Sequence, residues 1–206
     1  MQSVTDKVLN RIQRKPRGST FSGKDFLDLA SRASVDKALS TLAQAGQIRR
    51  VCRGVYDYPR VSEELGGELS PDYDQVAQAI ARSNGVRIEA SGAWAANLLG
   101  LSTQVPAKIV YLTNGTSRTF RVGKQAIAFE RVGPRQLRAK PGTSSLVVQA
   151  LCHLGKDRVD EGLVEHLKTH LSPSERKSLL RDARYTSDWI FEVIKRIASG
   201  GGHGHG

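Results

Sequence analysis

The sequence predicts an α+β fold, in which helices and short antiparallel strands occupy separate stretches of the chain. Apolar residues recur at helical spacing near both ends, and short runs rich in β-branched and aromatic residues lie between them. Turn signals interrupt these runs, notably at Arg53-Gly54, Asn114-Gly115 and Gly123-Lys124. A chain of 206 residues has room for one medium domain or two small ones.

Basic side chains are concentrated in two stretches of this chain, whose net charge is +11. Residues 1–60 hold 12 Lys or Arg against 5 Asp or Glu, and residues 82–140 hold 10 against 2. Between them, residues 61–81 hold five acids and no Lys or Arg. Each phosphate that a basic side chain neutralises releases condensed counterions, so these stretches favour a polyanionic partner. A merely well-solvated surface is the alternative.

Neither a membrane span nor a secretion signal is predicted. No apolar run approaches the roughly 20 residues that a membrane helix needs, and the N-terminus has no continuous apolar segment. The two cysteines, Cys52 and Cys152, are far apart and have no CxxC partner, which favours a reduced, cytoplasmic setting. Cys152 is expected in the core of a helical segment.

The N-terminal part of the sequence is predicted to form, in order, a helix, a short extended segment and a second helix. Residues 4–13 carry an apolar stripe at helical spacing, and residues 19–21 follow as the extended segment. Ser22 and Asp25 match the S-x-x-[DE] capping pattern. A second helix is therefore expected to run from there to about residue 30.

A third helix and a hairpin follow a tight turn at residues 31–33. The helix is expected over residues 34–45, where Gly46 suits the left-handed residue that closes a helix. Its apolar stripe consists of Val35, Ala38, Leu39 and Leu42. Two short strands then meet around Arg53-Gly54. This order of elements is typical of a winged helix-turn-helix, which we predict for residues 1–60.

The opposite face of the third helix is predicted to bind DNA. It presents hydrogen-bonding side chains suited to base edges and phosphates in the major groove, and the hairpin adds a basic wing for the neighbouring backbone. The predicted contacts are Arg32, Ser34, Lys37, Ser40, Thr41 and Gln44 on the helix, and Arg49, Arg50 and Arg53 on the wing. Two alternatives stay open, since winged helices also bind proteins and arginine can lie over tyrosine through a cation–π contact.

An acidic, glycine-containing stretch at residues 61–71 is expected to link this domain to a second, α+β domain over residues 72–198. Its turn signals predict an antiparallel β meander, and apolar stripes after residue 140 predict C-terminal helices. The expected strands are 86–90, 108–113, 118–122 and 126–129, and the expected helices before residue 140 are 72–83 and about 91–100. Residues 199–206, rich in glycine and histidine, are expected to be a disordered tail.

The chain resembles a known family over nearly its whole length, up to the glycine-rich tail, and two segments carry the resemblance. They read RRVCRGVYDYP at residues 49–59 and RIEASGAWAANLLGLSTQVPAKIVYLTNGTSRTF at residues 87–120. The second segment follows a winged helix that ends in the first. In this arrangement the chain is similar to the AbiEi-like antitoxins of type IV toxin–antitoxin systems, in the small branch catalogued as a domain of unknown function. The most specific piece is AANLLGLSTQVPAKIVYLTNG at residues 95–115.

The resemblance implies a two-part, DNA-binding antitoxin and transcriptional autorepressor. Its N-terminal domain would bind double-stranded DNA at repeats in its own promoter. Its C-terminal domain would counteract, directly or indirectly, a nucleotidyltransferase toxin encoded beside it. The alternative function is a winged-helix regulator without a toxin partner, whose second domain serves dimerisation or ligand sensing.

No set of residues predicts an enzyme, a metal site or a cofactor. Asp25 and Asp28 are three residues apart, whereas the metal-binding carboxylates of nucleotidyltransferases flank a single residue. His166 and His170 have helical i, i+4 spacing but no third ligand at a fitting distance. We therefore expect a non-enzymatic protein, although a nucleic-acid-processing enzyme stays a third hypothesis.

The second basic stretch has no single predicted role. It consists of Lys108, Arg118, Arg121, Lys124, Arg131, Arg135, Arg138 and Lys140. These side chains could extend a DNA footprint, contact RNA or an acidic toxin surface, or simply solvate one face of a sheet.

Overall fold

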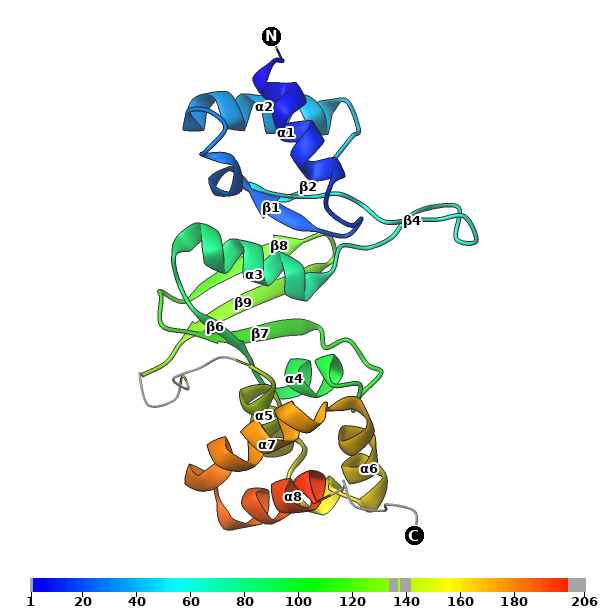
Figure 1. Cartoon of the computed structure of the whole chain (residues 1–206), viewed down its shortest axis with the longest axis vertical. Helices are drawn as coiled ribbons and strands as arrows, with labels where there is room; N and C mark the ends of the chain where they lie inside the picture. Colours follow the sequence, from blue (N-terminus) through cyan, green and yellow to red (C-terminus); the bar gives the residue numbers. More distant parts are fainter. Residues whose placement is uncertain (1, 134–136, 138–141, 200–206) are drawn as a thin grey trace. The chain divides into compact units, whose positions relative to one another are not determined.

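The predicted α+β class is confirmed by a computed structural model, which describes residues 2–133, 137 and 142–199. Helices and short antiparallel strands are mixed in the first part of the chain, and the last part, after β9 (Gln125–Arg131), is helical (Figure 1). The chain divides into two compact units, of which the first contains residues 1–86 and 120–127. The second contains residues 87–119 and 128–206. The expected linker and the helix expected over residues 72–83 thus belong to the first unit.

The first unit begins with two helices packed on a small sheet. Its elements are α1 (Val4–Gln13), β1 (Thr20–Ser22), a 3-10 helix (Gly23–Phe26), α2 (Arg32–Gln44), β2 (Arg49–Cys52) and β3 (Val55–Asp57). The strand order is β1-β3-β2, so β3 is central and β2 lies at the edge. Both helices bury their apolar stripes against Phe21 and Phe26, whose rings meet edge to face at 5.5 Å.

The expected second helix is wrong in kind and length. Asp25 does cap the segment by accepting a hydrogen bond from the Ser22 N–H at 2.7 Å, but only one 3-10 turn follows. The Leu29 N–H then donates to the Phe26 carbonyl, which makes a turn in place of an α-helix. Helix nucleation is costly, and so short a segment is held mainly by the burial of Phe26.

The third helix begins earlier than its expected start at residue 34. The Ser31 side chain accepts a hydrogen bond from the Ser34 N–H and so acts as the N-cap of α2. The expected tight turn at residues 31–33 is therefore wrong, because Arg32 and Ala33 form the first turn of the helix. At the other end, Gly46 has the left-handed φ of 70° that the sequence predicts.

Residues 61–71 contain regular structure where only a linker was expected. They form a two-stranded antiparallel hairpin of β4 (Val61–Ser62) and β5 (Gly67–Glu68). The next helix, α3 (Tyr73–Asn84), packs on β1 and β3 of the first unit. The Thr20 hydroxyl donates to the Gln75 carbonyl at 2.7 Å, and Arg82 lies 3.8 Å from the Asp25 carboxylate.

The remaining strands form a four-stranded sheet whose order differs from a simple meander. They are β6 (Ile88–Ala90), β7 (Lys108–Thr113), β8 (Arg118–Val122) and β9 (Gln125–Arg131), with α4 (Gly92–Leu98) after β6. The sheet order is β6-β7-β9-β8, so β7 and β8 are not neighbours. On the other side of β7, the Asn114 side chain accepts from the Arg87 N–H at 2.8 Å and so joins the end of β7 to the start of β6.

The expected C-terminal helices are confirmed. They are α5 (Thr143–Leu154), α6 (Glu161–His170), α7 (Pro173–Asp182) and α8 (Asp188–Ala198), and they enclose a common apolar core. The expectation for Cys152 is wrong: its side chain is exposed, because α5 buries the stripe that contains Val147, Val148 and Leu151. Two further expectations, the tail from residue 200 and part of the second basic stretch, lie outside the described residues.

No helix within residues 2–133 and 142–199 is both long enough and apolar enough to span a lipid bilayer.

Candidate nucleic-acid interface

Helix α2 has one buried face and one exposed face, as its sequence predicts. Val35, Ala38, Leu39 and Leu42 are at most 2% exposed. Between these positions the helix exposes a polar stripe at i, i+3, i+4 and i+7, formed by Lys37, Ser40, Thr41 and Gln44. The packing of the apolar stripe into the core therefore fixes which side chains the helix presents to a partner.

Some polar side chains of α2 already have partners within the chain. Arg32 donates from Nε to both carboxylate oxygens of Asp36 at 2.8 and 2.9 Å, across one helical turn. The Ser34 and Ser31 hydroxyls are hydrogen-bonded to each other at 2.9 Å. The Thr41 hydroxyl donates to the Lys37 carbonyl, so only its lone pairs are left for a ligand.

Three side chains of the exposed stripe are uncommitted. Lys37, Ser40 and Gln44 make no side-chain hydrogen bond or ion pair within the described ranges. Together they offer an ammonium group, a hydroxyl and an amide, which can bind phosphates, sugars or base edges. These three positions are thus the part of α2 best suited to contact a nucleic acid.

The β2–β3 hairpin carries two further uncommitted cations. Its turn is at Arg53-Gly54, where Gly54 has a left-handed φ of 75° and nothing lies within 4 Å of the place where a Cβ would be. Arg50 and Arg53 are exposed, and neither guanidinium has a hydrogen bond or ion pair in the part of the chain that the structure describes. Both are available to contact phosphate.

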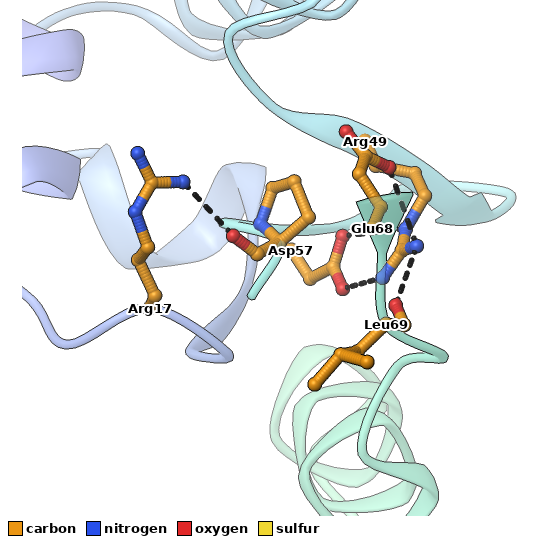
Figure 2. A network of polar contacts seen from close by, with 6 residues as sticks. Arg17, Arg49, Asp57, Glu68 and Leu69 are labelled. Atoms are coloured by element: carbon orange, nitrogen blue, oxygen red, sulfur yellow. Dashed lines mark hydrogen bonds and ion pairs between the residues drawn. The ribbon is translucent and has the colours of Figure 1, made fainter. Parts of the chain in front are cut away.

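Arg49, the third predicted wing residue, is used inside the protein. Its Nε and Nη2 donate to the two carboxylate oxygens of Asp57 at 3.1 and 2.5 Å, and its Nη1 donates to the Leu69 carbonyl at 2.9 Å (Figure 2). The Glu68 carboxylate lies 3.4 Å from the same Nη1. Asp57 is 1% exposed, so this pair is largely withdrawn from water. The network was not predicted, although the opposite charges of Arg49 and Asp57 are visible in the sequence.

A β-bulge explains why Arg49, rather than its neighbour, pairs with Asp57. A regular hairpin with Arg53 and Gly54 as its loop would place Arg50 opposite Asp57. The register shifts at Val51, so that Arg49 faces Asp57 and Arg50 faces Tyr56. The bulge thus commits one half-buried arginine to hydrogen bonds within the protein and leaves the next one exposed.

The second basic stretch is divided by the structure. Lys108 forms an ion pair with Glu130 at 3.0 Å, and the Arg131 N–H donates to the Ser117 hydroxyl. Within the described residues, Arg118, Arg121, Lys124 and Arg131 are exposed and their side chains form no ion pair. The other members, Arg135, Arg138 and Lys140, lie outside the described residues. The role of this stretch stays open.

The residues weighed as catalytic or metal-binding candidates have structural contacts. Asp25 caps the 3-10 helix, while Arg11 binds Asp28 at 2.7 Å and this hydrogen bond lowers the pKa of Asp28. His166 Nε2 is 2.9 Å from the Leu99 carbonyl, and its ring stacks on His170 with centroids 4.0 Å apart. Among the described residues, no three His, Cys, Asp or Glu side chains are grouped to hold a metal ion.

Fold and surface together define an α+β protein whose first unit exposes a polar helix face and a basic hairpin. The chain belongs to the family of unknown function DUF6088, whose model matches residues 7–179. Among solved structures it is similar to the RV2827C protein from Mycobacterium tuberculosis, with 15% identity and a TM-score of 0.41. That alignment covers 95% of this chain and 76% of the other. No curated protein matches the chain.

Proposed function

We propose that the protein binds double-stranded DNA through α2 and the β2–β3 hairpin. The observation that carries the proposal is the division of α2 into two faces. One face is buried, and the other presents Lys37, Ser40 and Gln44 with no partner in the described chain. An α-helix fits the major groove, where such side chains can bind base edges.

The hairpin supplies the electrostatic part of the proposed interface. Arg50 and Arg53 are exposed and uncommitted, so they can neutralise phosphates beside the groove. Arg32 and Ser34, at the start of α2, stay in the proposed contact set as phosphate contacts, although Asp36 offsets part of the charge of Arg32. Arg49 is left out, because its donors are directed at Asp57 and Leu69.

We further propose that the protein is a non-enzymatic, cytoplasmic antitoxin and autorepressor. In this role, it would bind its own promoter and counteract a nucleotidyltransferase toxin. The support for this step is the resemblance of residues 49–59 and 87–120 to AbiEi-like antitoxins. A regulator without a toxin would use the same DNA surface, so the identity of the adjacent gene separates the two functions.

Titration of labelled DNA tests the proposal. Fluorescence anisotropy would compare a duplex from the region upstream of the protein's own gene with a shuffled duplex of equal length. The proposal predicts tighter binding to the upstream duplex. Gln44→Ala is expected to reduce that preference by about 1–3 kcal/mol if it removes a base contact. Binding to neither duplex at low salt would refute DNA binding, and equal binding to both would refute the autorepressor role.

A further inference from the structure

The Arg49–Asp57 pair lies at the end of the β2–β3 hairpin that is farthest from its turn. Asp57 is the last residue of β3 and is paired across the sheet with Thr20 on one side and Arg49 on the other. Its carboxylate is 1% exposed, and Arg49 meets it with two parallel N–H···O bonds. A carboxylate withdrawn from water in this way is costly unless it is paired, so the side chain of Asp57 requires Arg49.

The two strands of the hairpin are anchored differently. β3 is central, and the chain that leaves it is held by residues 17–19. The Tyr58 N–H donates to the Ser19 carbonyl, and the Gly18 N–H donates to the Tyr58 carbonyl. Arg17 donates to the Pro59 carbonyl at 3.0 Å, and Figure 2 shows this bond as the dashed line from Arg17. Arg17 also lies over the Tyr58 ring at 4.4 Å. The exit of β3 is therefore fixed without any help from Arg49.

The edge strand β2 has fewer anchors. It is four residues long, pairs on one side only, and is interrupted by the bulge at Val51. Ile48, just before the strand, is buried in the core. Beyond it, Arg49 alone among the described β2 side chains forms an ion pair, and its bond to the Leu69 carbonyl also joins the strand to the residues that precede α3. A short hairpin of this kind is marginally stable by itself.

We propose that Arg49 is a positioning residue for the wing and not a DNA contact. By clamping β2 to Asp57 and Leu69, it holds Arg50 and the Arg53 turn in the conformation in which they meet the phosphates. This proposal rests on the proposed DNA-binding function. Its observational basis is that Nε, Nη1 and Nη2 of Arg49 each donate to an acceptor inside the protein.

The two possible roles of Arg49 predict opposite effects of Asp57→Asn. If Arg49 were a phosphate contact, removal of its buried anionic partner would release its charge and tighten DNA binding. If Arg49 positions the wing, the same change loosens β2, and the affinity falls by about tenfold as the contacts of Arg50 and Arg53 weaken. Asp28→Asn is the matched control, since it removes one negative charge from an exposed arginine pair. The control is expected to leave the affinity unchanged or slightly increased.

Arg49→Lys gives a second, independent readout. Lysine keeps the positive charge but cannot donate two parallel bonds to Asp57 and a third to Leu69. The positioning role therefore predicts that Arg49→Lys binds DNA about as weakly as Arg49→Ala. It also predicts that Arg50→Ala lowers the DNA affinity by a smaller factor in the Arg49→Lys background than in the wild type. A phosphate-contact role predicts that lysine restores nearly all of the binding and that the two changes act additively.

The experiment combines anisotropy titrations with hydrogen exchange of the unbound variants. In Arg49→Lys, the amides of residues 50–55 should exchange at least several times faster, while those of α2 stay as in the wild type. Unchanged exchange, or affinity restored by lysine, would overturn the proposal. If Asp57→Asn does not fold, Glu68→Gln replaces it as the test variant, because Glu68 lies at the exposed edge of the network. Glu68→Gln should raise the same exchange rates by a smaller factor. If the wild type binds no DNA, the proposed function fails, while the exchange data still decide whether Arg49 holds the hairpin.

Discussion

Arg50 and Arg53 should account for a measurable part of the salt dependence of DNA binding. Both guanidinium groups are exposed and have no hydrogen bond or ion pair in the described chain, so the double change to alanine removes two charges and breaks no such bond inside the protein. The slope of log K against log salt is negative, and each lost phosphate contact reduces its magnitude by about 0.9, or by about 1.8 for the pair. Between about 50 and 200 mM salt, the wild type should therefore lose about twelvefold more affinity than the variant.

The assay is an anisotropy titration of one duplex at four or more salt concentrations. Lys177→Ala combined with Arg184→Ala is a matched control, because it also removes two exposed cations that have no ion pair in the described residues, here from the second unit. The control should keep the wild-type slope within about 0.5 units. An unchanged slope in the Arg50/Arg53 variant, or an equal loss in the control, would refute the assignment of the hairpin as a phosphate-binding wing.

Three further predictions concern stability and reactivity. Leu39→Ala, at a fully buried position of α2, should lower the free energy of unfolding in urea by about 2–5 kcal/mol; a loss below about 1 kcal/mol would contradict the packing of this helix. The hydrogen bond from the Ser172 hydroxyl lowers the pKa of Glu175 below its usual value of 4.5, so the stabilisation is present above that pH and is lost as the pH falls through the lowered pKa. Glu175→Gln should thus lower the Tm at pH 7 and reduce the dependence of the Tm on pH below about 4.5, and an unaltered pH profile would exclude this role. Burial raises the pKa of the Cys52 thiol, whereas Cys152 is exposed. A thiol reagent at pH 8 should therefore label Cys152 first, which peptide mapping would show. Faster labelling of Cys52 would contradict the burial of its thiol.

The buried faces of α2 and of the C-terminal helices follow from local patterns in the sequence. The stripe of Val35, Ala38, Leu39 and Leu42 is enough to predict which face of α2 is buried, and hence which face carries Lys37. The same reasoning gives the C-terminal helices, where apolar periodicity and capping residues agree. These features depend on residues within one or two helical turns of each other, so a single sequence contains the information.

The features that the sequence does not reveal depend on distant residues. Asn114-Gly115 has the form of a hairpin turn, but the strand that follows it, β8, does not pair with β7. Asn114 instead binds the backbone of Arg87, 27 residues earlier. In the same way, one bulge residue decides whether Arg49 or Arg50 faces Asp57. A hairpin drawn from the sequence treats all three wing arginines alike, whereas the structure divides them into one internal clamp and two exposed cations.

Mapping of the bound duplex onto the protein by NMR tests the central claim most directly. A duplex from the upstream region would be titrated into isotopically labelled protein at low salt, and the backbone and side-chain signals followed. The DNA-binding surface proposed above predicts the largest shifts at Lys37, Ser40, Gln44, Arg50 and Arg53, with the buried face of α2 little affected. Shifts confined to the second unit, or no shifts with a saturating duplex, would contradict it.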